Sequence, residues 1–394
     1  EHLRELLNQF SLKNTPESIP FPCGVVGYFG YDLCHFIERL PDKAVDDMGI
    51  PDMYIAFYDT MISYDNFLNT CHVIGVDFGL DNKQNDRMEH MDNLLRRQSD
   101  AGYKPKDYMP GPVISEPTLK FNFTKELYMD AIGRIKEYIT AGDVYQVNLS
   151  QRIETHIDIP PYELYKKLRS INPAPFSSYL AFDDVAIISS SPERFLKVND
   201  RHVQTRPIKG TRPRGGDIKT DEMMKQALLA SQKDNAELTM IIDLERNDLG
   251  RVCDYGSVKV TERKVLETYP TVYHLVSTIE GDLYERYDFI DLLKATFPGG
   301  SITGAPKIRA MQIIDELEPT QRSVYTGSIG YIGFNGDADL NIAIRTYIMK
   351  GNTVYFQVGS GIVADSHAED EYEETMHKAK ALIDSLKTCP TSFS

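Results

Sequence analysis

Short β-forming runs separated by tight turns, with amphipathic helices grouped between them, place the strongest limit on how this chain can fold. Runs typical of strands cover residues 24–30, 54–64, 71–78, 185–190 and 353–358. Helical periodicity marks residues 124–142, 221–231, 306–317 and 371–386. Strands that cluster around turns, instead of alternating regularly with helices, predict an antiparallel α+β fold and disfavour a doubly wound parallel sheet.

Two local signals refine this prediction. Thr124 is the expected N-cap of the helix in 124–142, and Gly142 is expected to end it. Residues 98–117 are rich in Pro, Gly, Ser and charge without periodicity, which predicts a linker. The linker separates an N-terminal lobe, residues 1–117 including the linker itself, from residues 118–388. The sequence begins without an initiator Met or a signal-peptide pattern, so we expect this lobe to be truncated at its start.

Composition limits the partners that the chain can have. The formal net charge is −15 and the pI is about 5.1, which argues against nucleic acid or an anionic membrane as a main partner. No apolar run approaches the roughly 18 residues of a transmembrane helix. The five cysteines are scattered and form no CxxC pair, so no zinc site or disulfide framework is indicated. We therefore expect the cytoplasm, or a plastid if a transit peptide has been removed.

The segment 204–215 holds a single lysine, Lys209, between two prolines and beside glycines. Proline fixes the backbone, and glycine lets the chain turn closely. A lysine is a nucleophile near neutral pH only if burial or neighbouring positive charge lowers the pKa of its ammonium. Arg206, Arg212 and Arg214 are candidates to supply that charge. Taken alone, the segment favours a basic surface loop.

Carboxylates stand at two further positions of interest. Glu371 and Glu374 are three residues apart at the start of the last helix, so they project from one face. Oxygen ligands with room for water suit Mg²⁺, although a solvated acidic helix start is the more common explanation. The expected apolar face of this helix leaves both glutamates on its edge and consists of Tyr372, Met376, Ala379, Ile383 and Leu386.

Glu193 follows an apolar run, and His274 lies within one. Glu193 comes just after the apolar run 185–188, where burial would raise the pKa of its carboxyl towards that of a general acid. A salt bridge near Arg194 is the alternative. His274 lies among apolar residues, a setting more typical of a core histidine than of a catalyst.

Two glycine-rich segments are excluded as nucleotide sites. In 298–307 the pair Ala305-Pro306 separates the last glycine from Lys307, so no phosphate loop is formed. The segment is instead a turn that feeds a helix with Pro306 at its first position, where free amides can bind carboxylates. The segment 359–364 follows a strand, but the acidic helix start after it would repel a dinucleotide pyrophosphate.

Together, these separated motifs resemble the chorismate-utilising enzymes from about Gly24 to Leu386. Within that family, Pro207-Ile208-Lys209-Gly210-Thr211 resembles the active-site motif of component I of aminodeoxychorismate synthases. The related component I of anthranilate synthases usually carries Ala at the position of Lys209. The resemblance implies two packed antiparallel β-sheets flanked by helices, with both lobes belonging to one fold, and an enzyme of folate (4-aminobenzoate) biosynthesis.

The resemblance also implies roles for individual residues. Lys209 would be the nucleophile, Glu193 the acid that protonates the departing C4 hydroxyl of chorismate, and His274 a further catalytic group. Chorismate would be bound by Thr205, Ser301, Tyr325, Arg345, Gly359, Gly361 and Gln146. Magnesium would be held by Glu237, Glu371 and Glu374. Relatives that add water carry lysine at the position of Gln146, so glutamine there indicates the use of ammonia.

No glutaminase signature is present in the sequence, so we expect ammonia to come from a separate glutamine amidotransferase subunit. Two alternatives remain. One is component I of anthranilate synthase, which forms anthranilate and pyruvate. The other is a non-catalytic chorismate-binding subunit, which the presence of all the glutamates and of Lys209 disfavours.

Overall fold

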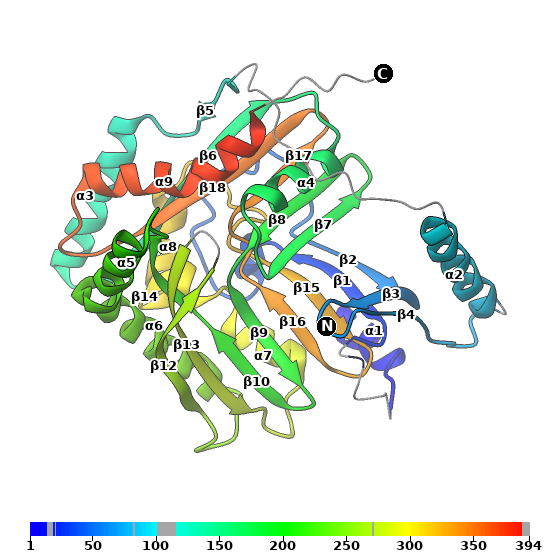
Figure 1. The fold of residues 1–394 in the computed structure, drawn as a ribbon. Helices are drawn as coiled ribbons and strands as arrows, with labels where there is room; N and C mark the ends of the chain where they lie inside the picture. The colour runs from blue at the N-terminus through cyan, green and yellow to red at the C-terminus, as the bar shows by residue number, and fades with distance from the viewer. Residues whose placement is uncertain (14–18, 20, 82, 101–115, 270–271, 388–394) are drawn as a thin grey trace.

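The computed structural model describes residues 1–13, 19, 21–81, 83–100, 116–269 and 272–387 (Figure 1). Its paired strands run antiparallel in two large sheets and one hairpin, with helices around them, which confirms the expected α+β class. Residues 101–115 of the predicted linker lie outside the described residues. Among the helices of the described ranges, none is long and apolar enough to cross a membrane.

The larger sheet has the strand order β11-β13-β10-β9-β16-β15-β1-β2, with β12 paired to β13. Its strands are β1 (Gly24–Phe29), β2 (Met53–Tyr58), β9 (Arg194–Asn199), β10 (His202–Arg206), β11 (Ile208–Pro213), β12 (Lys259–Thr268), β13 (Val272–Asp282), β15 (Ser328–Gly333) and β16 (Ala338–Asn341). The first and last thirds of the sequence therefore meet in one sheet, since β1 pairs with β15.

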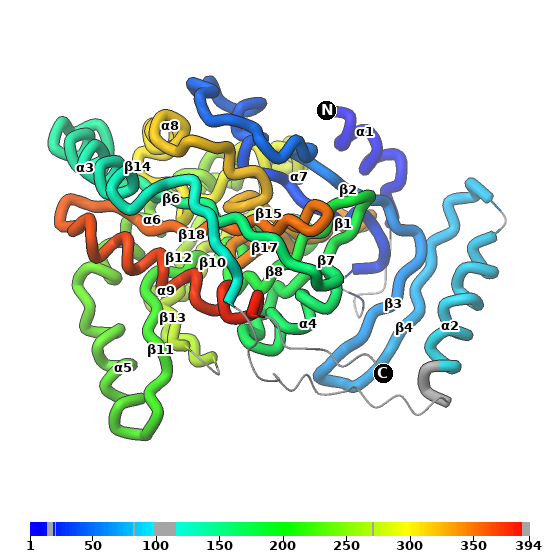
Figure 2. The backbone as a smooth tube through the Cα atoms, turned by 90° about the horizontal axis from the view of Figure 1, so that it is seen from above, coloured from blue at the N-terminus to red at the C-terminus, as the bar shows by residue number. Residues whose placement is uncertain are grey.

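The smaller sheet has the order β14-β6-β18-β17-β8-β7, with β5 paired to β6. Its strands are β5 (Lys120–Phe121), β6 (Gln146–His156), β7 (Phe176–Phe182), β8 (Val185–Ser191), β14 (Gly304–Ala305), β17 (Thr346–Lys350) and β18 (Thr353–Ile362). The separate hairpin is β3 (Thr60–Asp65) and β4 (Thr70–Gly75). Figure 2 shows this hairpin and the helix α2 (Gln84–Asp100) at one side of the molecule, opposite α3, α5 and α9.

The other helices cover the two sheets. Against the smaller sheet lie α3 (Lys125–Ala141), α4 (Pro161–Ile171), α8 (Lys307–Leu317) and α9 (Ala368–Leu386). Against the larger sheet lie α5 (Ile218–Ala230) and α6 (Gln232–Gly250). The remaining helical segments are α1 (His2–Gln9), α7 (Phe289–Thr296) and the short 3₁₀ segments η1 (Tyr31–Phe36) and η2 (Gly300–Ile302).

The two sheets pack on each other through apolar side chains. Tyr28 and Ile329 of the larger sheet share one buried cluster with Ile187 and Ile348 of the smaller sheet. A second cluster fills the space between the smaller sheet and helices α4 and α9. The largest cluster joins the larger sheet to α3, α6, α7 and α8. The cluster shared by the two sheets confirms the expected packed pair of sheets. Burial of apolar surface on both faces is the main contribution to the stability of this arrangement.

Local signals from the sequence are confirmed at α3 and corrected elsewhere. Thr124 caps α3 by accepting the Leu127 amide at 3.2 Å, and Gly142 ends the helix at φ 83°. The single strand run expected over 54–64 is divided between β2 and β3. The expectation that the segment 359–364 follows a strand is wrong at its start, because residues 359–362 continue β18 in register with β6. Full-length pairing with β6 outweighs the weak strand propensity of glycine.

Two of the places where the chain crosses between the sheets position the site. β8 of the smaller sheet leads into β9 of the larger sheet through Glu193, and β16 leads back into β17 through Arg345. The crossings are bonded to each other: the Ile342 amide donates to the Glu193 carbonyl at 3.0 Å, and the Ser190 amide donates to the Arg345 carbonyl at 3.1 Å. The two predicted site residues therefore lie where the sheets join.

Candidate active site

Glu193 is enclosed at the first crossing. Only 4% of the residue is exposed, and its Oε1 accepts the Ile208 amide at 3.3 Å. Burial raises the pKa of this carboxyl, although the Ser301 hydroxyl and the positive charges of Lys209 and Arg345 oppose the rise. The predicted salt bridge with the Arg194 region is not formed, because Arg194 pairs with Asp339. A carboxyl that keeps its proton more readily than usual can serve as a general acid.

Lys209 reaches the site because β11 bulges. The pairing of β11 with β13 shifts between Ile208 and Thr211, which inserts one extra residue at Lys209-Gly210 and re-aims the lysine. Gly210 adopts φ +81°, and a Cβ there would lie 2.8 Å from Leu228 and 3.0 Å from Asp234, so glycine is required. The ammonium of Lys209 donates to the Ser301 carbonyl at 2.9 Å.

The pKa of Lys209 lies below its ordinary value. Burial is the main cause, and the positive charge of Lys378 acts in the same direction against the pull of Glu237, Glu193 and Glu374. A buried lysine bonded to a neutral carbonyl therefore provides more free amine at neutral pH than an exposed one does.

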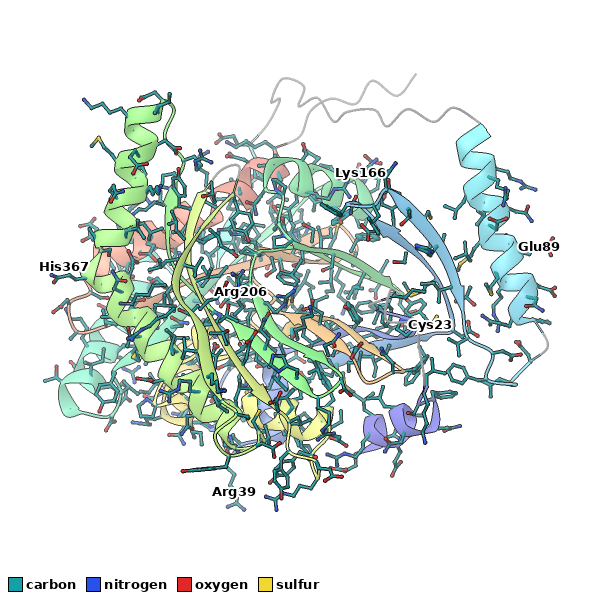
Figure 3. The ribbon with its side chains drawn as sticks, turned by 60° about the horizontal axis from the view of Figure 1, so that its bottom comes forward. Cys23, Arg39, Glu89, Lys166, Arg206 and His367 are labelled. Atoms are coloured by element: carbon teal, nitrogen blue, oxygen red, sulfur yellow. The ribbon has the colours of Figure 1, made fainter. Side chains whose placement is uncertain are left out.

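The arginines expected to activate Lys209 are engaged elsewhere, so that part of the sequence interpretation is wrong. Arg206, labelled in Figure 3 among the strands of the larger sheet, pairs with Glu262 and Glu267 of β12. Arg212 pairs with Asp234 at 2.8 Å, and Arg214 pairs with Asp221 at 2.6 Å. The neighbouring charges that shift the Lys209 pKa most are those of Glu237, Lys378, Glu193 and Glu374, and none of the three arginines is among them.

His274 lies opposite the bulge on β13. It is 2% exposed, its Nδ1 shares a hydrogen bond of 2.9 Å with the Thr211 hydroxyl, and Thr211 is its register partner. Burial and the nearby charge of Arg345 lower its pKa to about 3. The imidazole is therefore neutral at physiological pH and can donate or accept a hydrogen bond without carrying charge.

Arg345 is a partly buried arginine whose side chain has no carboxylate partner among the described residues. Its guanidinium donates to the Asn172 side chain at 3.2 Å and forms no ion pair with any described residue. Burial lowers its pKa, with Glu193 opposing. Its backbone adopts φ +51°, an uncommon conformation for a non-glycine residue that directs the side chain at the crossing. A guanidinium in this state is a strong site for a bidentate carboxylate.

The predicted substrate contacts Ser301, Gln146 and Gly361 come together. β6 carries Gln146, and its neighbour Asn148 donates to the Ser301 carbonyl at 2.7 Å. Gly361 of β18 is the register partner of Asn148. Gly359 lies two residues earlier on the same strand, and its carbonyl accepts the Lys378 ammonium at 3.0 Å.

Two other predicted substrate contacts, Tyr325 and Thr205, interact with side chains of the protein itself. Tyr325 is buried beside the guanidinium of Arg322, 5.9 Å from its ring centre. Thr205 donates its hydroxyl to Glu245 at 2.9 Å. Their roles as chorismate contacts stay predictions.

The predicted magnesium ligands lie on α6 and α9. Glu374 pairs with Lys378 at 2.8 Å, and Glu371 accepts the Ser366 hydroxyl at 2.7 Å and Lys233 at 3.1 Å. Burial and the charge of Glu374 contribute to a raised pKa of Glu237. Within the ranges that the structure describes, no group of three His, Cys, Asp or Glu side chains is arranged to hold a metal ion. Two mutually repelling carboxylates still suit Mg²⁺, which usually takes one or two carboxylates and completes its shell with water and ligand oxygens.

The expected edge position of Glu371 on the last helix is wrong. Glu371 lies on the buried face of α9 and is 3% exposed, together with Thr375, Ala379, Leu382, Ser385 and Leu386. The helix turns its polar residues inward because Ser366 and Lys233 satisfy the buried carboxylate.

Four site residues were missed from the sequence. Lys378 follows Glu374 by four residues, a spacing that could have indicated the pair. Asn148 and Asn172 gave no signal, because nothing in the sequence shows which carbonyl or guanidinium they meet. Glu245 is 7% exposed, and burial together with neighbouring Glu193 and Asp248 raises its pKa to about 8 despite the Thr205 hydroxyl. A helical glutamate in a polar stretch is usually exposed, so only the packing reveals it.

Comparison with known proteins agrees with this geometry. A sequence profile of chorismate binding enzymes matches residues 1–384. Anthranilate synthase component 1 of Aquifex aeolicus is 41% identical, over 99% of this chain and 79% of that protein. Aminodeoxychorismate synthase component 1 of Escherichia coli is also 41% identical, over 98% of this chain and 82% of that protein.

A solved structure shows the same fold. The crystal structure of anthranilate synthase component I from Streptococcus pneumoniae superposes with a TM-score of 0.86 at 33% identity, over 97% of this chain and 85% of that chain. Similarity therefore extends along nearly the whole sequence and to relatives that bear two different enzyme names. This chain belongs to the chorismate binding enzyme family.

Proposed function

We propose that the chain acts as component I of an aminodeoxychorismate synthase, converting chorismate and ammonia to 4-amino-4-deoxychorismate through a covalent bond to Lys209. The observation that supports this most is the state of Lys209 itself. It is an amine with a lowered pKa, bonded to a neutral carbonyl, and it interacts electrostatically with the protonatable Glu193. An alanine in its place, which the family resemblance makes usual for anthranilate synthases, would offer no nucleophile.

The proposed first step consumes the proton of Glu193. The neutral Lys209 amine adds to ring carbon 2 while the ring double bond moves and the C4 hydroxyl departs as water, protonated by Glu193. The adduct nitrogen is then positively charged and Glu193 is a carboxylate. In the second step ammonia adds to C4, the double bond moves back, and Lys209 leaves as the neutral amine. Glu193 recovers its proton from the new ammonium group, directly or through solvent.

Binding of the dianionic substrate falls to the positive groups that lack a full partner. Arg345, partly buried and without an ion pair among the described residues, would take one carboxylate. Glu237 and Glu374, with Glu371 beside them, would hold Mg²⁺, which when bound supplies positive charge for the ring carboxylate. A net charge of −15 makes such local positive charge necessary.

We also propose a glutamine amidotransferase subunit as the source of ammonia. The supporting observation is that similar proteins of both activities bear the name component 1. The sequence itself carries no glutaminase signature.

Anthranilate synthesis is the second candidate. Its supporting observations are the 41% identity to a protein of that name and the neutral, buried His274, which could handle a proton during loss of pyruvate. In this reaction ammonia itself would attack ring carbon 2, and Lys209 would obstruct that attack.

A mass measurement separates the two candidates. The wild-type protein is incubated with chorismate and Mg²⁺ without ammonia, digested, and searched for an adduct on the peptide that contains Lys209. We expect the adduct in the wild type and in Lys197→Ala, a control at an exposed lysine of β9, but not in Lys209→Ala. With ammonium added, the product should have the mass and ultraviolet spectrum of 4-amino-4-deoxychorismate. Anthranilate as the sole product, without an adduct, would establish the second candidate.

A further inference from the structure

Hydrogen bonds connect the two residues that handle nitrogen in the proposed reaction. Gln146 Nε2 donates to Asn148 Oδ1 at 3.3 Å, and Asn148 Nδ2 donates to the Ser301 carbonyl at 2.7 Å. The same carbonyl accepts Lys209 Nζ at 2.9 Å. Asn148 is therefore the only link in this series that touches both the glutamine and the carbonyl that holds the lysine.

Asn148 determines which end of the Gln146 amide is free. Since Asn148 Nδ2 is directed to Ser301, its Oδ1 faces Gln146 and attracts the Nε2 group. Gln146 Oε1 is left buried, and no donor among the described residues reaches it. A buried acceptor without a donor is costly, so this atom favours a ligand that can donate an N–H or O–H.

The surroundings fix Asn148 itself. The backbone amide of Asn148 donates to the Thr303 carbonyl at 2.8 Å. The backbone carbonyl of Asn148 accepts the guanidinium of the buried Arg322 at 2.8 Å. Arg322 also donates to the Ile302 carbonyl at 3.0 Å, so strand and loop are held together. On the neighbouring strand, a Cβ at Gly361 would lie 2.8 Å from Gln146 Nε2 and 2.9 Å from Asn148 Oδ1. Glycine at 361 leaves the space that this pair of amides fills.

The Ser301 carbonyl has a matching effect on Lys209. A neutral amine that donates one N–H to a fixed oxygen has its lone pair directed away from that oxygen. Holding the carbonyl in place therefore holds the direction of attack. Small errors in such directions reduce rates strongly.

We propose that Asn148 is a positioning residue for both nitrogens: Nδ2 fixes the Ser301 carbonyl that orients the Lys209 amine, and Oδ1 holds Gln146 so that its Oε1 accepts an N–H of incoming ammonia. The inference rests on the proposed function, because it assumes a covalent lysine and ammonia as the second nucleophile. An ammonia molecule bonded through one N–H keeps its lone pair free for the ring carbon.

Two substitutions separate the two bonds. Asn148→Asp cannot donate to Ser301 but still accepts from Gln146, whereas Asn148→Leu loses both bonds. Asn122→Asp is the matched control, since Asn122 also bonds to β6, accepting the Arg152 amide at 2.7 Å and donating to Thr320 at 3.0 Å. The measurements are the rate of adduct formation on Lys209 without ammonia, the KM for ammonia, and the thermal midpoint of each full-length variant.

We expect both Asn148 variants to form the adduct about tenfold more slowly or worse. The KM for ammonia should rise about tenfold in Asn148→Leu and change less than about twofold in Asn148→Asp. The Asn122→Asp control should alter neither quantity, even if its thermal midpoint falls. Adduct rates and KM values equal to those of the wild type, or losses that follow the thermal midpoint in all three variants, would overturn the proposal.

The two hypotheses fail differently. If the wild type forms no adduct, the proposed function and the lysine half of this inference are both overturned. The difference in KM for ammonia between Asn148→Leu and Asn148→Asp would then still support the glutamine half. If the wild type forms the adduct and the variants form it equally fast, only the positioning role is overturned.

Discussion

Two arginines of this molecule stand in opposite states. Arg322 is 2% exposed and pairs with Glu318 at 2.7 Å, and it also donates to the carbonyls of Ile302 and Asn148. Arg345 is partly buried and has only the Asn172 side chain as a hydrogen-bond partner among the described residues. Burial lowers the pKa of Arg345, whereas Glu318 keeps that of Arg322 raised despite its burial.

The difference separates residues that stabilise the fold from residues that bind. A satisfied buried ion pair is part of the folded structure, and removing one partner leaves an uncompensated charge. An unsatisfied buried charge costs stability until a ligand of opposite charge arrives. Within the site, two further groups lack a full partner. Lys209 donates to a neutral carbonyl instead of a carboxylate, and Gln146 Oε1 has no donor among the described residues.

Exchanging each arginine for methionine is the most severe test of this contrast. We expect Arg322→Met to lower the free energy of unfolding by about 3–5 kcal/mol, because Glu318 is left buried and unpaired. We expect Arg345→Met to leave that free energy unchanged or higher, and to lower kcat/KM for chorismate about 100-fold. Urea unfolding and steady-state kinetics measure the two effects.

A double variant supplies the control for the ion pair. Replacing Arg322 and Glu318 together, as Arg322→Met with Glu318→Leu, should recover part of the stability lost by Arg322→Met alone. Equal losses of stability at Arg322 and Arg345 would contradict the distinction between the two arginines.

The carboxylates of α6 and α9 allow the same comparison, between charges that stabilise the fold and charges that bind a ligand, to be made with negative groups. Glu237→Gln or Glu374→Gln should lower chorismate turnover at least about tenfold, and raising the Mg²⁺ concentration should partly restore it. In the absence of metal, Glu237→Gln should not reduce stability, because burial and the charge of Glu374 raise the pKa of Glu237. Glu374→Gln also loses the ion pair with Lys378. Excess chelator should abolish the activity of the wild type, and full activity in chelator would refute the magnesium assignment. Glu137→Gln, at an exposed glutamate of α3, is the matched control.

How far the sequence predicts this site depends on the kind of contact. Motifs identify Lys209, Glu193 and Arg345, because each stands in a recognisable local segment. The bulge that aims Lys209 depends on register with β13, and the positive φ of Arg345 depends on the crossing between sheets. Neither can be read from local periodicity. Propensity also failed at residues 359–362, where pairing with β6 extends a strand through two glycines.

Charge balance is the other quantity that the sequence did not predict. The arginines next to Lys209 in sequence are neutralised by acidic residues that are distant in sequence, such as Glu262 and Glu267. Pairing across strands decides which charges remain free, and tertiary contacts set that pairing. The fold class, the α3 boundaries and the packed sheets were predictable because they follow from periodicity, capping and the family resemblance.

Glu245 offers a test of intermediate size, since it is buried with a hydroxyl partner but without a cation. Its pKa is raised from 4.5 to about 8. Between these values the unfolded chain has released the proton and the folded chain keeps it, so this group makes stability fall as pH rises from about 4.5 to 8. Glu245→Gln removes that dependence.

The variant should therefore gain stability relative to the wild type on going from pH 5 to pH 8, by about 1–3 kcal/mol. Urea unfolding at the two pH values measures the change, with Glu137→Gln again as the exposed control. A difference between Glu245→Gln and the wild type that is independent of pH would show that Glu245 is already ionised in the folded protein.

The smallest effect is expected at Gln146, the unsatisfied acceptor. Gln146→Lys replaces an acceptor oxygen that has no donor by an amine. In its neutral form this amine can take a proton from water. We expect amination to fall and a minor part of the turnover to yield a hydroxylated product. Mass analysis of the products with and without ammonium measures this share. Gln151→Lys on the same strand is the control, because Gln151 bonds to Thr375 and lies outside the series that reaches Lys209. If Gln146→Lys forms no hydroxylated product while its amination rate is unchanged, the open acceptor at Gln146 does not contact the incoming nucleophile.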